Sequence, residues 1–330
     1  MKWLLTSIAF VAVYSTAQAQ DLPPNLPVAD GTNPSIVSFE PVTRQAGMLR
    51  GNTLFPNFIG FLSNPIESID PRSVTTIWPI FGSAWASGND SRLPSGNLQS
   101  YGAGLNVALT DRLSIGLNQG GYITSRFSND RERKLADLGL PVRDLDRSGS
   151  RSGWLNLGGF VQYTLIADVQ RQFILTAGMR WEAPSGSTQV FQGSGPAYLA
   201  PYLTVGKEFG KFHFLATTGY EFPAGTGDAT SNKFYANFHI DRQFGWLYPL
   251  AEVNCSFSNS TLDLNVQTPD HGVVNLGTFS STGNSVALAF GANAVLIPSK
   301  LEFGAVYMRP ITSRNAYDFN GVLVKMVYRY

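Results

Sequence analysis

From Val74 onward, apolar and polar residues alternate along the chain at every second position. Residues 99–109 show this clearly, with Tyr101, Leu105 and Val107 in one phase and Ser100 and Asn106 in the other. A period of two over about ten residues is typical of a β-strand with one apolar face. The pattern recurs to the C-terminus and predicts twelve strands, over residues 74–87, 99–109, 113–124, 153–165, 172–182, 197–207, 211–221, 233–241, 247–255, 285–296, 301–308 and 322–330.

The connections between these strands are alternately short and long. Short turns are expected over residues 110–112, 167–171, 208–211, 241–245 and 297–300, and longer loops over 88–97, 125–152, 183–195, 223–231, 256–283 and 309–317. Strict alternation places all short turns at one end of a meander and all long loops at the other. This layout, with an even number of strands, is that of a bacterial outer-membrane barrel. A soluble sandwich or jelly roll does not require it.

The charged residues of the strands fall almost entirely in one phase, as with Arg180, Glu221 and Lys325, whereas the other phase is aliphatic and aromatic. A charge on the lipid-facing side of a barrel costs about 2–4 kcal/mol near the bilayer midplane. The polar phase is therefore expected to face the lumen. Alternation alone leaves a soluble barrel open, because that barrel would place the apolar phase inside. The loop alternation and an export signal favour an all-β, transmembrane, antiparallel up-and-down barrel over residues 74–330.

The first nineteen residues have the features of a secretory signal peptide. Lys2 supplies a positive charge, Trp3 to Tyr14 form an apolar run, and Ala17-Gln18-Ala19 is a small-x-small cleavage site. An N-terminal anchor helix is the alternative, but the run is shorter than the roughly 20 residues that span a bilayer. The signal predicts export, and together with the barrel it predicts localisation in the bacterial outer membrane.

The composition and the motif content of the chain exclude several classes of function. Charged residues are 14% of the chain and the formal net charge is +1, so nothing favours a nucleic-acid partner. Cys255 is the only cysteine, which excludes an internal disulfide and a multi-cysteine metal site. No phosphate loop, dinucleotide fingerprint or Gly-x-Ser-x-Gly elbow is present. We therefore expect no enzyme, no cofactor and no metal.

The chain ends on an aromatic residue in the apolar phase. Tyr330 closes the chain, with Tyr328, Met326 and Val324 in the same phase before it. This resembles the C-terminal signature of outer-membrane barrels that the barrel-assembly machinery reads, so Tyr328 and Tyr330 are the candidate assembly signal.

The central third resembles a known family. Its residues are Ala183-Pro184-Ser185-Gly186, Gly193-Ser194-Gly195, Pro201, Ala216 to Tyr220, and Phe222-Pro223. Their spacing resembles the outer-membrane β-barrel family linked by name to the meta-pathway of phenol degradation. The resemblance covers about residues 172–225 and implies a barrel of this size that passes small organic molecules. The N-terminal part of the chain departs from the family's opening.

Residues 20–73 form an N-terminal extension of different character. The part up to Pro41 is rich in proline and asparagine and is typical of an extended linker. Apolar residues between Thr53 and Leu62 have helical spacing, and the favoured interpretation is a short amphipathic helix at the barrel end or membrane interface. The alternative is a plug inside the lumen, with Leu54, Phe55, Phe58 and Phe61 as its candidate residues.

Candidate lumen residues are the charged and aromatic members of the polar phase. They are Arg180, Glu182, His213, Glu221, His239, Glu252, Glu302, Lys325, Arg329, Tyr198, Tyr202 and Tyr235. Two interpretations remain open: a mixed-charge constriction that selects small solutes, or a closed interior in which the charges only pair with each other. The two histidines with Glu221 could bind a metal, but a hydrogen-bonding role is favoured.

The sequence therefore predicts an outer-membrane channel for small, weakly polar organic solutes. The alternative is a structural or surface-interaction barrel with a closed lumen. Expected partners are outer-membrane lipid, lipopolysaccharide, the barrel-assembly machinery and small solutes. Loop 125–152 is rich in arginine and aspartate and is interpreted as a solvated loop, with a lipopolysaccharide-facing or lumen-folding loop as the alternative.

Overall fold

The computed structural model describes residues 49–86, 96–127, 150–190, 192–193, 196–225, 231–260, 283–314 and 319–330. The predictions for the signal peptide, for residues 20–48 and for most of loop 125–152 lie outside these residues. The strands are β1 (Thr76–Ala86), β2 (Gly96–Ala108), β3 (Leu113–Gln119), β4 (Gly121–Phe127), β5 (Ser150–Trp154), β6 (Leu157–Asp168), β7 (Phe173–Ala183), β8 (Ala197–Phe209), β9 (Phe212–Ala224), β10 (Ser231–Arg242), β11 (Leu247–Ser260), β12 (Gly283–Ile297), β13 (Leu301–Arg314) and β14 (Phe319–Arg329). One short 3₁₀ helix, η1 (Thr188–Val190), lies between β7 and β8.

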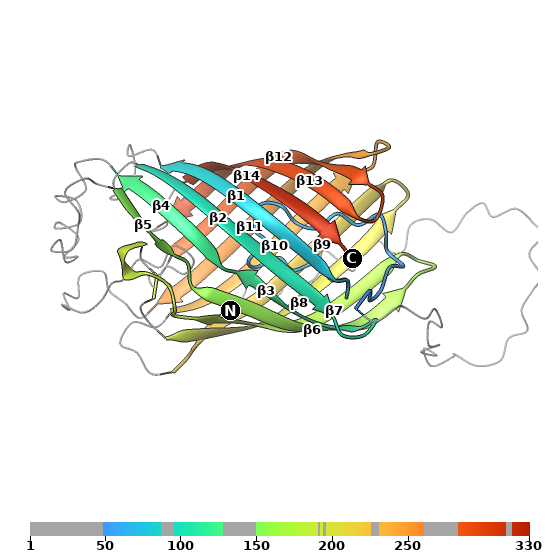
Figure 1. Cartoon of the computed structure of the whole chain (residues 1–330), viewed down its shortest axis with the longest axis horizontal. Helices are drawn as coiled ribbons and strands as arrows, with labels where there is room; N and C mark the ends of the chain where they lie inside the picture. Colours follow the sequence, from blue (N-terminus) through green and yellow to red (C-terminus); the bar gives the residue numbers. More distant parts are fainter. Residues whose placement is uncertain are drawn as a thin grey trace, which may run out of the picture. The chain divides into compact units, whose positions relative to one another are not determined.

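These strands form a single closed antiparallel barrel (Figure 1). β1 pairs with β2 on one side and with β14 on the other, which closes the ring. β3 and β4 are two halves of one crossing that breaks at Gly120, and β5 and β6 are halves of the next, broken at Leu155 and Asn156. Counted as crossings, the barrel has the twelve strands that the alternation predicted, and the predicted fold class is confirmed.

The breaks in the third and fourth crossings were not predicted. The pairing of β3 with β6 shifts register between Leu117 and Gln119, so one residue is left out of the ladder. The pair Gly120 and Gly121 follows directly, and Gly121 lies so close to β2 that an added Cβ would be 2.2 Å from the Tyr101 carbonyl oxygen. Glycine permits this close approach, and a bulge of this kind bends a strand.

The two phases of the alternation face opposite sides of the wall. On β8, Thr204 is fully buried inside, whereas its neighbour Leu203 is 46% exposed on the outside. The outer face carries a nearly continuous band of aliphatic and aromatic side chains, including Ile115, Val161, Leu203, Phe214, Phe238, Phe290, Phe303 and Met326. Water-soluble monomers rarely expose apolar patches above a few hundred Å². An apolar exterior with a polar interior is the pattern of a membrane-spanning barrel, which decides against the soluble alternative.

No helix among the described residues is long and apolar enough to cross a membrane.

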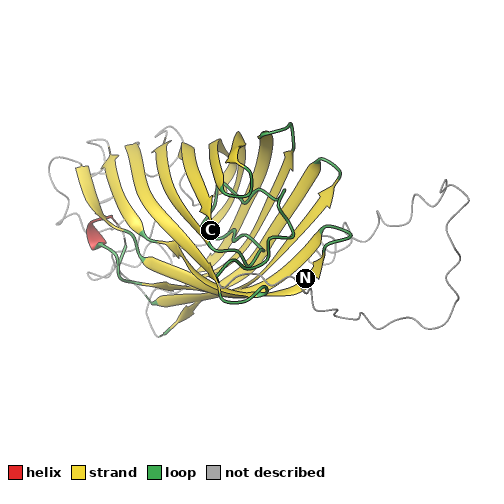
Figure 2. Cartoon of the chain, turned by 45° about the vertical axis from the view of Figure 1, so that its right-hand side comes forward, coloured by secondary structure: helices red, strands yellow, loops and turns green. Residues whose placement is uncertain are grey.

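The N-terminal segment of residues 51–73, here called the inner segment, runs inside the barrel (Figure 2). The short amphipathic helix expected over Thr53 to Leu62 is wrong, because this stretch consists of turns and extended chain. Phe55, Phe58 and Leu62 are at most 1% exposed. The apolar residues of this stretch are spaced as in a helix, but their side chains extend from an irregular backbone and pack against separate apolar clusters of the wall.

Candidate functional site: a segment held inside the barrel

The inner segment touches the wall on all sides of the lumen. Its hydrogen-bonding partners come from β2, β3, β6, β7, β8, β10, β11 and β14. Several wall side chains donate to its backbone carbonyls. Gln162 on β6 reaches the carbonyl of Asp70 at 2.9 Å, and Thr176 on β7 reaches that of Pro71 at 2.6 Å. These bonds satisfy the polar groups of a segment that has no secondary structure of its own.

An apolar pocket in the wall holds the first half of the inner segment. Phe55, Phe58 and Phe61 form one buried cluster with Ile174 of β7 and Leu215 of β9. The Phe55 and Phe58 rings lie 5.8 Å apart. Leu54 is half-buried and packs against the same cluster. Ile174 and Leu215 are apolar residues in the otherwise polar inward phase, and they lie where the phenylalanines dock.

Glu252 of β11 binds the backbone of the inner segment directly. Its carboxylate accepts the N–H of Leu62 at 2.8 Å and the N–H of Ser63 at 2.7 Å. On the same strand, the Asn254 amide donates to the Ser63 hydroxyl at 2.7 Å. Hydrogen bonds to a charged group contribute about twice as much as neutral ones. We call Glu252 and Asn254, with Leu62 and Ser63, the latch.

A row of histidines and carboxylates leads from the latch along the wall. His239 places Nδ1 2.7 Å from Glu252 and Nε2 2.9 Å from Asp241. Asp241 in turn lies 2.5 Å from His213 Nδ1. Both ring nitrogens of His239 face carboxylates, so a doubly protonated ring satisfies both contacts. The histidines contact Asp241 and Glu252 rather than Glu221. Among the described residues, no set of histidine, cysteine or acidic side chains is arranged to hold a metal ion.

A second ionic group connects β7, β9 and β10 to the inner segment. Arg180 pairs with Glu221, and Lys233 lies 3.2 Å from Glu221 and 2.7 Å from Glu67 of the inner segment. Burial alone would raise the pKa of Glu67, but the Lys233 ammonium and the Arg180 guanidinium hold that pKa below its ordinary value. Glu182 is also buried here, 3.7 Å from Arg180.

A third ionic group closes the C-terminal end of the inner segment. Arg72 pairs with Asp70 at 2.6 Å and donates to the Phe55 carbonyl at 2.9 Å, which ties the two ends of the segment together. Although burial opposes ionisation, the neighbouring Arg72 keeps the pKa of Asp70 below its usual range. Lys325 of β14 donates to the Phe61 carbonyl.

Arg329 of β14 pairs with Glu302 of β13, its neighbour in the wall, and its charge also acts on Asp70 of the inner segment.

The aromatic candidates are all buried inside the barrel. Tyr198, Tyr202 and Tyr235 are at most 5% exposed, and the Tyr202 hydroxyl donates to Gln162 at 3.0 Å. Inward glycines on neighbouring strands make room for two of these rings. An added Cβ on Gly178 would lie 2.4 Å from the Tyr202 ring, and one on Gly219 would lie 2.4 Å from that of Tyr235. The missing side chains of these glycines therefore make room for aromatic rings in a narrow lumen.

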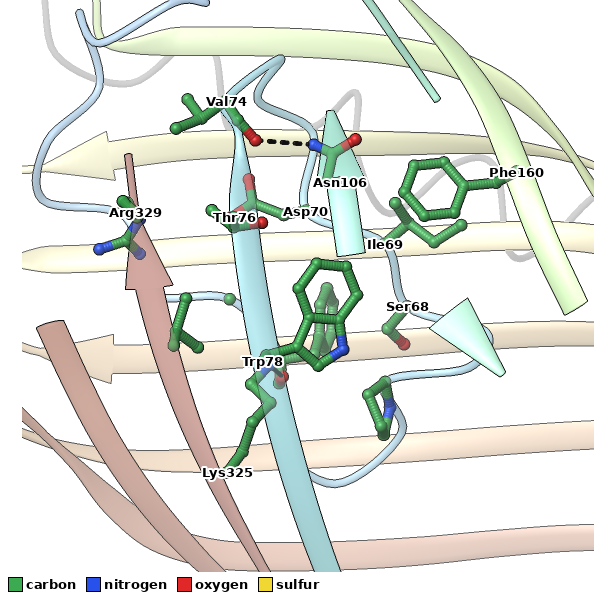
Figure 3. Close-up of a pocket in the computed structure, with 14 residues that line it drawn as sticks. Ser68, Ile69, Asp70, Val74, Thr76, Trp78, Asn106, Phe160, Lys325 and Arg329 are labelled. Carbon is green, nitrogen blue, oxygen red and sulfur yellow. Dashed lines mark hydrogen bonds between the residues drawn. The ribbon is translucent and has the colours of Figure 1, made fainter. Parts of the chain in front are cut away.

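A small cavity remains between the inner segment and the wall (Figure 3). Its volume is about 40 Å³, and Asp70, Trp78, Phe160 and Lys325 are among the residues that line it. A buried water needs about 10–15 Å³ on this measure, so this space accommodates a few water molecules. The inner segment thus leaves little free volume in this part of the lumen.

The remaining predicted residues lie on the outer face. Tyr328 and Tyr330 are 45% and 65% exposed at the end of β14, and the Tyr330 N–H donates to the Thr75 carbonyl at 3.0 Å. Of the ends of loop 125–152, Arg126 is exposed, whereas Arg151 is buried and donates to the Gln189 carbonyl at 3.4 Å. The structure therefore places only the two ends of this loop.

Sequence reasoning missed several residues that hold the inner segment. Asp241 ends the predicted strand 233–241 and begins the predicted turn 241–245. It was not among the candidates, although it follows His239 by two residues and so shares its inward phase. Lys233 was placed in a strand but not among the candidates. Glu67, Asp70 and Arg72 lie in the N-terminal extension. There, no regular alternation of apolar and polar residues indicates which way a side chain points.

Comparison with solved structures places this fold among outer-membrane barrels. The COG4313 outer membrane channel from Pseudomonas putida F1 superposes with a TM-score of 0.52 at 13% identity, covering 80% of this chain and 98% of that one. The β domain of the Bordetella autotransporter BrkA matches at a TM-score of 0.44 and 12% identity, covering 78% and 100%. OmpF of Salmonella typhi, solved with daunomycin, matches at a TM-score of 0.34 and 10% identity, covering 82% of this chain and 100% of that one. No family model and no curated protein matches the sequence.

The class that fold and site define is a twelve-stranded membrane-spanning β-barrel with an N-terminal segment inside its lumen. At 13% identity, the likeness to the Pseudomonas putida channel concerns the fold.

Proposed function

We propose that this protein is a bacterial outer-membrane channel for the passive passage of small, weakly polar organic solutes, closed by the inner segment in the state described here. The observation that carries the proposal is the inner segment itself. It spans the lumen between strands on all sides, and it is held by hydrogen bonds, ion pairs and one apolar cluster. All of these contacts can break without a covalent step, so the proposed opening needs no chemical change in the chain.

The nature of the wall supports solute passage. With the inner segment displaced, the wall would present carboxylates, cations and the rings of Tyr202 and Tyr235 to a solute. Rings beside paired charges suit an organic molecule with a small polar group. The resemblance to the family named for phenol degradation favours the same class of solute. The fold shared with the Pseudomonas putida outer membrane channel favours passage through the barrel, whatever the solute.

The proposal includes the surroundings of the barrel. The chain would be exported by its signal peptide, residues 1–19, and inserted by the barrel-assembly machinery through Tyr328 and Tyr330. It would contact outer-membrane lipid, and lipopolysaccharide at the loop end. It would have no enzymatic activity, cofactor or nucleic-acid partner.

A second candidate function is a structural barrel whose lumen stays closed. It is favoured by the pairing of the wall charges, because Arg180, Glu221, Lys233 and Glu302 all have ionic partners with the inner segment in place. In this case the inner segment would be a permanent core that stabilises a narrow barrel.

Single-channel recording in planar bilayers separates the two. The mature chain is compared with a variant lacking residues 21–73 and with a control lacking only residues 21–48, which keeps the inner segment. The channel proposal expects a clearly larger conductance for the first deletion and an unchanged conductance for the control. Absence of current steps in all three proteins, together with no flux of small aromatic solutes into liposomes, would establish the closed barrel.

A further inference from the structure

A hollow on the lipid-facing surface is formed by outward-facing side chains of the wall. Its volume is about 320 Å³, and its lining includes Val205, Lys207, Phe214, Ala216, Phe238 and Ala251. Its lining also includes the inward-phase residues Leu215, His239 and Glu252, so the wall is thin between the hollow and the lumen. We call this hollow the outer groove. Its volume is at the lower end of the range of pockets that bind small molecules. It belongs to β8 through β12, a part of the barrel without strand breaks.

The outer groove is hollow because small residues lie between large ones in the lipid-facing phase. Ala216 on β9 is paired with Val205 on one side and with Phe238 on the other. Ala251 on β11 lies between Ile240 and Phe290. Side chains directly opposite one another on paired strands are neighbours on the same face. The two alanines therefore form low parts of the floor on either side of β10, and the larger side chains around them form the walls.

The outer groove runs from one end of the barrel toward its middle. Lys207 lies two residues before the end of β8 (Ala197–Phe209), next to the short turn that leads to β9. At the other end, Leu288 lies within β12 (Gly283–Ile297), well away from either end of that strand. In barrels of this class the short turns are periplasmic. The groove thus leads from the periplasmic membrane interface into the hydrocarbon region.

The interfacial end of the outer groove is basic and aromatic. The Lys207 ammonium lies 5.0 Å from the centre of the Phe209 ring and donates to the carbonyl of Arg171, in the preceding turn. The Arg171 side chain is 83% exposed, and its only described acidic partner is Asp168 at 3.8 Å. Lys207 therefore places a cation at the mouth of an apolar groove, and the exposed Arg171 lies in the adjacent turn, at the level of the lipid headgroups.

We propose that the outer groove binds one phospholipid of the periplasmic leaflet. An acyl chain would lie over Ala216 and Ala251, between Phe214 and Phe238, and the phosphate would lie against Lys207 and Arg171. The charge at the mouth favours an anionic headgroup over a second copy of this chain, whose own basic end would face it across a symmetric contact. This site does not depend on the channel and would bind lipid even if the lumen never opens.

The test is native mass spectrometry of the full-length mature protein, purified in detergent and titrated with phosphatidylglycerol. The wild type is expected to retain one lipid per chain. The double variant Ala216→Phe/Ala251→Phe fills the floor and is expected to lose this adduct. Loss of the Lys207 charge in Lys207→Gln is expected to weaken binding about fivefold, as one basic residue near a headgroup contributes.

Matched controls change the same residue types elsewhere on the outer face. Ala103→Phe on β2 and Ala305→Phe on β13 add the same rings outside the outer groove, and Lys300→Gln removes a lysine from another turn. All three are expected to bind like the wild type. Equal retention of phosphatidylglycerol by the filled variant would overturn the proposal. So would a dimer in the wild type that disappears in the filled variant, because a second copy would then occupy the groove.

Discussion

The carboxylate of Glu252 accepts a hydrogen bond of 2.8 Å from the backbone N–H of Leu62, which precedes it by 190 residues. This contact joins the twelve-stranded wall to a segment that has no strand of its own. It is directed at the main chain, so the side chain at position 62 need not be polar. Leu62 is then free to place its own side chain against Leu250, Ala289 and Val306 of the wall.

Replacing Glu252 with alanine is expected to release the inner segment. The change removes the acceptor for two backbone N–H groups, and each hydrogen bond to a charged group is worth about 1.5–3 kcal/mol. Arg72 is 3% exposed in the docked segment, so trypsin cleavage after Arg72 measures release. We expect cleavage of Glu252→Ala to be at least tenfold faster than that of the wild type. Glu252→Gln keeps one acceptor oxygen, so its rate of cleavage after Arg72 should lie between those of the wild type and Glu252→Ala.

The control for this experiment is Asp111→Ala, which removes an acid from the turn between β2 and β3. It should leave cleavage after Arg72 at the wild-type rate. If Glu252→Ala and Asp111→Ala behave alike, the latch contributes nothing to docking.

Phe58→Ala is expected to weaken docking through the apolar cluster. Phe58 is fully buried against Ile174 and Leu215, and truncation of a buried phenylalanine to alanine costs about 3–5 kcal/mol. The thermal unfolding of the barrel should change little, because the lost contacts join the inner segment to the wall and not strand to strand. Circular dichroism and trypsin cleavage report these two effects separately. Phe303→Ala, on the lipid-facing side of β13, should leave cleavage after Arg72 unchanged.

The barrel was predictable from sequence because the alternation of its strands is periodic and long. The burial of Arg180 and His239 follows from the same period, since each lies in the inward phase. The inner segment was not predictable in this way. Phe55, Phe58 and Phe61 have helical spacing, yet they pack as single side chains from an irregular backbone whose hydrogen bonds come from the distant strands. A local pattern carries no information about such partners.

Acid is expected to release the inner segment. Glu67 faces Lys233, Arg180 and Asn64, and Asp70 faces Arg72 and Arg329; the pKa of each carboxyl lies below its ordinary value, 4.5 for Glu67 and 3.8 for Asp70. A carboxyl with a lowered folded-state pKa stabilises docking above its ordinary value, and this contribution is lost as the pH falls through the folded-state value.

The corresponding measurement is single-channel conductance between pH 7 and pH 3. We expect conductance to rise only below about pH 4.5, the ordinary pKa of Glu67. Glu67→Gln should raise conductance already at pH 7, because the amide cannot pair with Lys233. A flat profile in the wild type would show that neither carboxyl controls docking.

Locking the latch with a disulfide is expected to hold the channel closed. The Ser63 hydroxyl and the Asn254 amide are in direct contact at 2.7 Å. Because a cysteine is shorter than an asparagine, a disulfide between these positions draws the inner segment toward β11. The variant Ser63→Cys/Asn254→Cys is made with Cys255→Ser, which removes the natural cysteine beside it. Oxidised protein should resist both acid-induced conductance and trypsin cleavage after Arg72, and a thiol reductant should restore both. The single variant Ser63→Cys with Cys255→Ser controls for the loss of the Ser63–Asn254 hydrogen bond. If the oxidised protein conducts as well as the reduced protein, solutes pass without displacement of the inner segment, and the proposed gate is wrong.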